Sequence, residues 1–170
     1  MKAPSIKLLA YYHLIGGALG CFLSVDALAG TTVNSTNEAL VYGAATLLFL
    51  FSAYIGYVGL KGSARSFTKL AIPYQLLQSV TFSFDQLVAY KFFSGLSIVI
   101  GAPLNDLLLW RLTFNLSTFF VGWERPMESF AGINLVALLM IYWIMQHRWS
   151  GNGQAISSAK LEPHRMESTP

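Results

Sequence analysis

The chain has 170 residues, of which 54% are hydrophobic and only 11% are charged. Typical soluble domains carry about 25% charged residues, so this composition, with a mean hydropathy of +0.51, excludes an ordinary soluble protein. The net charge of +3 is attributed to basic residues flanking membrane spans, and it does not predict nucleic-acid binding. The single Cys21 excludes an internal disulfide, CxxC redox chemistry and cysteine-based zinc sites.

The first apolar run covers residues 8–25 and follows a short basic segment with Lys2 and Lys7. Its length predicts a membrane span. Gly16 and Gly20 have the GxxxG spacing, which favours close helix packing. Two alternatives involve cleavage: residues 27–29 form an A-x-A-like signal-peptidase site, and residues 18–21 resemble a lipobox. The tyrosines and glycines of the run are unfavourable for either kind of signal.

A second span is predicted at residues 39–60, after a polar connection. Gly56 is one of several small residues expected to pack against another helix. The following connection, residues 61–69, carries Lys61, Arg65 and Lys69 and no acidic residue. This is the pattern of a cytoplasmic loop.

The third apolar stretch, residues 70–102, is interpreted as a membrane helix with a polar stripe. At helical spacing Gln75, Gln78, Asp85 and Gln86 fall on one side, which must face other helices or a water-filled cavity. The stretch is longer than the about 20 residues that a span requires. It therefore tilts, extends beyond the bilayer, or breaks near Gly95; one long helix with a bend at Gly95 is the preferred interpretation.

Asp85 is the most informative candidate in this stretch, because a carboxylate inside a membrane must be neutral, paired or hydrated. It predicts either a proton or ion site or an interhelical hydrogen bond. Lys91 is expected to extend to an interface. His13 is a candidate partner of Asp85 in a proton relay, although a hydrogen-bonded packing histidine is the preferred interpretation. The histidines lie in different regions of the sequence and predict no metal site.

The connection at residues 103–129 contains an alternating segment, residues 110–117. Trp110, Leu112, Phe114 and Leu116 fall on one side of it. This is strand periodicity, and an interfacial segment is the equal alternative. The β-prone residues 30–36 or a second copy of the chain are candidate strand partners. Residues 130–149 are predicted to form the last span, with Asn134 inside it, and residues 150–170 a disordered cytoplasmic tail.

These segments predict an all-α integral membrane protein with four transmembrane helices in a small bundle. Basic residues then place both termini and residues 61–69 in the cytoplasm, and a short β-like element in the extracytoplasmic loops. The expected location is the bacterial inner membrane. The sequence contains no phosphate loop, HExxH or GxSxG motif.

Function is therefore predicted only as a class. The chain is expected to be a non-enzymatic partner-binding or assembly subunit of a membrane complex, with no cofactor. Its partners are the lipid bilayer and either another protein or further copies of itself. The alternative is an oligomeric transporter or channel that uses Asp85, Gln86, Gln78, Gln75, Lys91 and His13.

Overall fold

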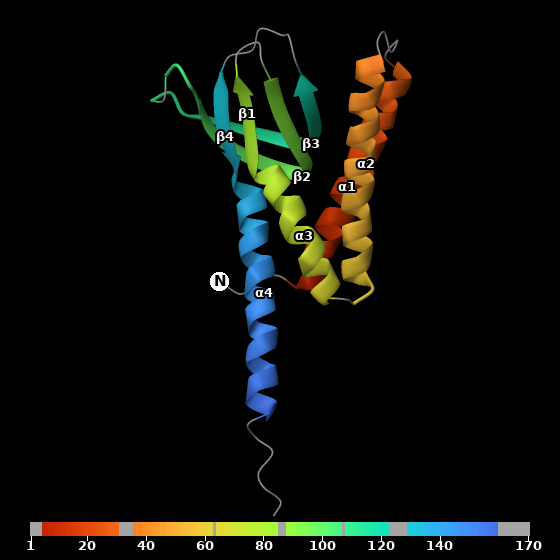
Figure 1. Ribbon diagram of the computed structural model, residues 1–170, viewed down its shortest axis with the longest axis vertical. Coiled ribbons are helices and arrows are strands. Elements are labelled where there is room, and N and C mark those ends of the chain that lie inside the picture. Colours follow the sequence, from red (N-terminus) through yellow and green to blue (C-terminus); the bar gives the residue numbers. More distant parts are fainter. Residues whose placement is uncertain are drawn as a thin grey trace, which may run out of the picture.

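The computed structural model describes residues 5–30, 36–62, 64–84, 88–106, 108–122 and 129–159. In chain order the elements are α1 (Ile6–Gly30), α2 (Thr36–Leu60), α3 (Ala64–Ser79), β1 (Val80–Phe84), β2 (Val88–Pro103), β3 (Arg111–Gly122), β4 (Phe130–Asn134) and α4 (Leu135–Ala159). The protein thus has a mixed α/β fold (Figure 1). The prediction of an all-α bundle of four transmembrane helices is wrong.

Helices α1 and α2 form an antiparallel hairpin, seen at the right of Figure 1. Both are long and apolar enough to cross a membrane, over Ile6–Ala29 and Ala39–Leu60, which agrees with the first two predicted spans. Small residues let the two backbones approach: a Cβ added at Gly17 would lie 2.5 Å from the Ala53 nitrogen, and one at Gly56 would lie 2.5 Å from the Leu14 nitrogen. Gly56 therefore packs within this hairpin.

The predicted helix at residues 70–102 does not form. Helix α3 begins earlier, at Ala64, and ends at Ser79, and two strands follow it. Aromatic and β-branched residues dominate β1 (VTFSF) and much of β2; these residue types favour strands because their side chains pack well on a pleated surface. The interpretation of this stretch as one membrane helix is therefore wrong beyond Ser79.

The four strands form an antiparallel sheet in the order β1-β4-β2-β3, and β1 also pairs with β2. Strand β2 is the centre of the sheet because it pairs with all three others. Its register with β3 shifts between Phe93 and Leu96. Gly95, with φ of 91°, lies in this bulge, and such bulges bend the strand that contains them.

Strand β3 includes the alternating residues 110–117 except Trp110, so the strand interpretation is correct for Arg111–Ser117. Its partner is β2. Of the proposed partner at residues 30–36, positions 31–35 lie outside the described residues.

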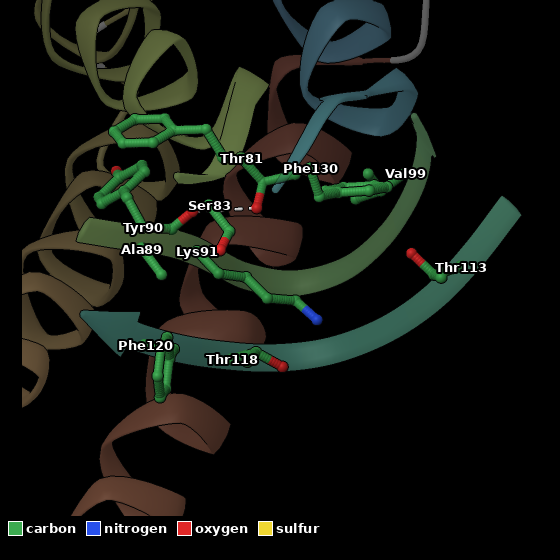
Figure 2. Close-up of a pocket in the computed structure, with 11 residues that line it drawn as sticks. Thr81, Ser83, Ala89, Tyr90, Lys91, Val99, Thr113, Thr118, Phe120 and Phe130 are labelled. Atoms are coloured by element: carbon green, nitrogen blue, oxygen red, sulfur yellow. Dashed lines mark hydrogen bonds between the residues drawn. The ribbon is translucent and has the colours of Figure 1, made fainter. Parts of the chain in front are cut away.

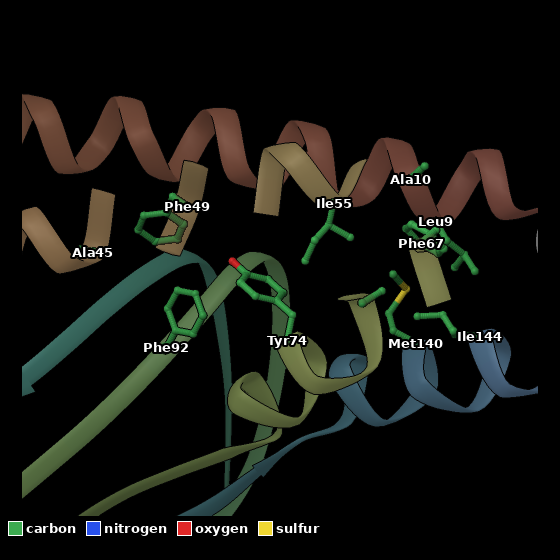
Figure 3. Packing of buried hydrophobic residues seen from close by; sticks show 11 residues of the cluster. Leu9, Ala10, Ala45, Phe49, Ile55, Phe67, Tyr74, Phe92, Met140 and Ile144 are labelled. Atoms are coloured by element: carbon green, nitrogen blue, oxygen red, sulfur yellow. The ribbon is translucent and has the colours of Figure 1, made fainter. Parts of the chain in front are cut away.

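The sheet packs against the helices through an aromatic core (Figure 3). The Phe92 ring of β2 lies 5.5 Å from that of Phe49 on α2 and 5.6 Å from that of Tyr74 on α3, between centroids. The same hydrophobic core continues to the N-terminal end of α1, where Leu9 and Phe67 are buried together with Ile144 of α4.

The predicted fourth span is divided between β4 and α4. Only Leu135–His147 of α4 is a continuous apolar segment, and it is shorter than the two candidate spans. Asn134 lies at the start of the helix, where its Oδ1 accepts hydrogen bonds from Val136 N at 3.1 Å and Ala137 N at 3.4 Å. Helix α4 continues to Ala159, into the segment predicted to be a tail; residues 160–170 lie outside the described part.

Candidate functional site

A buried polar cluster lies where α1, α2 and α3 meet the bulge of β2. Its centre is His13, which is fully buried. The His13 Nδ1 lies 3.3 Å from Ser52 Oγ, and its Nε2 lies 3.3 Å from Gln75 Nε2. Because the Gln75 amide nitrogen can only donate, the His13 Nε2 accepts and the Nδ1–H donates to Ser52. The imidazole in this arrangement is neutral.

Ser52 connects the histidine to the sheet. Its hydroxyl donates to the His13 carbonyl at 3.1 Å and accepts from Ser94 Oγ at 2.9 Å. With the His13 Nδ1–H as a second donor, all the hydrogen-bonding capacity of this hydroxyl is used. Three segments far apart in the sequence are thereby held together by one serine.

The bulge itself is stabilised by side chains. The Ser94 N–H donates to Gln78 Oε1 at 2.6 Å, and the Gly95 N–H donates to Ser117 Oγ at 2.9 Å. The Ser117 hydroxyl in turn donates to the Gly16 carbonyl of α1 at 3.1 Å. These bonds pair two amides in the interval where the β2–β3 register shifts, which would otherwise be buried without partners.

Gly16 is the contact point between α1 and the bulge. A Cβ at this position would lie 2.7 Å from the Gly95 nitrogen and 2.8 Å from its Cα. A Cβ at Gly20 would collide with the Phe49 ring. The two glycines predicted to bind another helix therefore pack against the sheet and against α2 of the same chain.

Three of the predicted site residues, His13, Gln75 and Gln78, meet in this cluster. The side chains are 0%, 0% and 1% exposed. Gln75 Oε1 and Gln78 Nε2 have no hydrogen-bond partner among the described residues. Within that part of the chain, the cluster contains hydroxyl, amide and imidazole groups but no carboxylate, so its evident capacity is to orient helices and sheet through hydrogen bonds.

Asp85 and Gln86 lie outside the described residues, between the end of β1 and the start of β2. The predicted pairing of His13 with Asp85 is therefore not part of the described structure, in which His13 contacts Ser52 and Gln75. Lys91 lies apart from the cluster, in a pocket on the other face of the sheet (Figure 2).

Sequence patterns did not identify Ser52, Ser94 and Ser117 as members of the cluster. Serine is common in loops and membrane helices alike, so its presence alone carries little information. The useful signal was the adjacent Ser94-Gly95 pair, which was interpreted as the position of a bend in one long helix and is a strand bulge.

Fold and site together define a mixed α/β protein with two helices that are long and apolar enough to cross a membrane. No protein-family model matches the chain, and neither the curated proteins nor the solved structures contain a significant match to it.

Proposed function

We propose that the chain is a non-enzymatic membrane subunit that binds a protein partner through the free edge and apolar face of β3. The observation that carries this proposal is the position of β3 at the end of the strand order. Among the described strands it pairs only with β2. Ser117 packs against α1, so the part of the outer edge that precedes Ser117 is the part proposed to offer hydrogen-bonding groups to another chain.

The β3 apolar face, as we name it here, consists of Leu112, Phe114 and Leu116. They are 55%, 67% and 57% exposed. Trp110 and Leu108, just before the strand, are 67% and 91% exposed and extend this apolar surface. Contiguous exposed apolar residues of this kind mark association surfaces.

The depth of the sheet strengthens the argument for a protein partner. The Tyr12 hydroxyl donates to the Leu96 carbonyl at 2.7 Å, and Gly16 touches Gly95, so the bulge lies beside the central part of α1. If α1 spans the bilayer, as proposed here, the sheet lies at the depth of one leaflet. Lipid can cover apolar side chains but cannot satisfy a strand edge, which only protein can cover there.

The proposed topology keeps both termini in the cytoplasm. Lys7, Lys61, Arg65 and Lys69 belong to the start of α1, the α2–α3 connection and α3, which meet at one end of the helical hairpin (Figure 1). Helix α4 runs from the sheet toward this same end. Basic residues on one side of the membrane support the cytoplasmic assignment of that side, and an inner-membrane location.

The alternative function, an oligomeric transporter or channel, has less support. Its residues His13, Gln75 and Gln78 are packed in a closed cluster, and the geometry around Asp85 and Gln86 lies outside the described structure. The partner-binding function is therefore the one that a specific surface favours.

Photocross-linking tests the proposal. A benzoyl-phenylalanine placed at Phe114 in cells that express the protein should give one discrete protein adduct, which mass spectrometry identifies. The matched control is the same probe at Tyr57, an exposed aromatic residue of α2, which should give only lipid adducts. An adduct of doubled mass would identify a second copy as the partner. Lipid adducts alone at Phe114 would overturn the proposal.

A further inference from the structure

The pocket on the other face of the sheet has a volume of about 400 Å³ and is open on one side (Figure 2). Strand pairing explains which side chains share it. Ser83 pairs with Ala89 and Phe130, and Lys91 pairs with Phe120. Paired residues lie on the same face of a sheet, so β1, β2, β3 and β4 all contribute to one concave surface.

Paired glycines create room for the apolar part of this pocket. Gly101 and Gly132 lie opposite one another. A Cβ at Gly101 would lie 2.5 Å from the Phe130 ring, and one at Gly132 would lie 2.8 Å from Val99 Cγ1. Without side chains at these two positions, Phe130 and Val99 can line the pocket close to the backbone.

Lys91 is the single cation among the residues that line the pocket. Its Nζ lies 5.8 Å from the centroid of the Phe93 ring, and no carboxylate pairs with it within the described ranges. Figure 2 shows its side chain extending across the concave face. An anion in the pocket would supply the missing counter-charge.

A second polar group in the pocket also lacks a partner. Ser83 is 9% exposed, and its buried Oγ has no hydrogen-bond partner among the described residues. The neighbouring Thr81 hydroxyl, by contrast, donates to the Tyr90 carbonyl at 3.0 Å. Buried hydroxyls are normally paired, so Ser83 provides hydrogen-bonding capacity that the described protein groups do not use.

We propose that this pocket binds a single-chain amphiphile with an anionic head group. The head group pairs with Lys91, and the chain lies along Val99, Phe120 and Phe130. The volume is near the lower end of ligand pockets, about 300–1,000 Å³, which suits one acyl chain better than a two-chain phospholipid. This inference goes beyond the partner-binding function and does not depend on it.

The test measures displacement of a dansyl-labelled undecanoate from the full-length protein in a non-ionic detergent. Dodecanoate and dodecyl phosphate are the competitors, and their relative affinities distinguish a free fatty acid from a phosphate head group. We expect at least one of them to bind at least about tenfold more tightly than dodecanol, because a charge-assisted contact is lost with the alcohol.

Variants localise the effect. Lys91→Met should weaken binding of the anionic competitor about tenfold, whereas Lys91→Arg should retain most of it. Thr113→Trp narrows the pocket from the exposed start of β3 and should weaken binding while leaving Lys91 intact. The matched control is Lys69→Met, an exposed lysine of α3, which should bind like the wild type.

The proposal is overturned if dodecanol competes as well as the anions, if the wild type binds none of these probes, or if Lys91→Met and Thr113→Trp both bind normally. If Lys91→Met fails to fold, Thr113→Trp and Lys91→Arg decide the question: normal binding by the first variant, or loss by the second despite a native fold, contradicts the proposed site.

Discussion

Gly16 shows how much of this fold depends on one missing side chain. It has the spacing of a helix-dimerisation residue in the sequence, yet its neighbour is the backbone of Gly95 in the bulge of β2. The Gly16 carbonyl also accepts a hydrogen bond from the Ser117 hydroxyl of β3. Contact between a helix backbone and a strand backbone allows the buried polar cluster around His13 to form.

The first prediction compares two glycines that both lie in long apolar helices. Gly16→Ala should destabilise the protein by about 1–3 kcal/mol, because the added methyl group collides with a backbone that cannot retreat. At Gly43, where a Cβ would meet nothing within 4 Å, the same change should be neutral or stabilise by up to about 1 kcal/mol through helix propensity. Thermal unfolding in detergent, followed by circular dichroism, measures both. Equal effects at the two positions would contradict the assigned contact.

At the scale of elements, the join between β4 and α4 explains why hydropathy alone was misleading. The apolar residues on both sides of Asn134 predicted a continuous span, but this residue ends a strand and caps a helix. The side-chain oxygen of an asparagine can accept hydrogen bonds from the unpaired backbone N–H groups of a first helical turn. Asparagine is therefore common at helix starts. A count of apolar residues across this position cannot reveal that boundary.

The second prediction concerns this cap. Asn134→Ala should destabilise the protein by about 0.5–2 kcal/mol, because two amides of the first turn of α4 lose their acceptor. Asn134→Asp is the matched control, since its side chain still accepts these bonds. The measurement is the unfolding midpoint in detergent. An alanine variant as stable as the wild type would show that the cap contributes nothing.

Sequence patterns predicted some elements well and others poorly for identifiable reasons. The helices at residues 8–25 and 39–60 were recognisable because their apolar runs have the length of a span. Gln75 and Gln78 were correctly placed on one face, because their spacing is helical and α3 is a helix there. Beyond Ser79, apolar content was taken for helix, although residues such as Val80, Ile98 and Val99 favour strands.

The meeting of His13 with Ser52 and Ser94 could not have been predicted from the sequence. These residues lie on α1, α2 and β2, about 40 positions apart in the sequence, and the contact with Ser94 depends on the bulge between Phe93 and Leu96. Apart from a glycine, which can adopt the positive φ that some bulges require, bulges have no strong sequence signature. Tertiary contacts of this kind need the register of the whole sheet.

The whole molecule consists of a helical hairpin, α1 and α2, with a curved sheet beside it (Figure 1). Each helix of the hairpin has 25 residues, or about 37 Å at 1.5 Å per residue, enough for the about 30 Å of a hydrocarbon core. On the proposed account the hairpin spans the membrane. The sheet presents the β3 apolar face to a partner and its pocket to an amphiphile.

The central claim of this account is that the hairpin crosses the membrane with residues 61–69 inside and the β2–β3 connection outside. Accessibility of single cysteines tests it directly. In a Cys21→Ala background, Asn105→Cys and Arg65→Cys each place one thiol at an exposed position. The reagent is a membrane-impermeant maleimide applied to spheroplasts and, separately, to permeabilised cells.

We predict that Asn105→Cys reacts in intact spheroplasts, whereas Arg65→Cys reacts only after permeabilisation. The reason is that the positive-inside rule places the basic residues 61–69 in the cytoplasm. The membrane fraction should contain both variants. Reaction of both thiols in intact spheroplasts, or the reverse pattern, would contradict the proposed topology, and recovery of the protein in the soluble fraction would contradict membrane insertion.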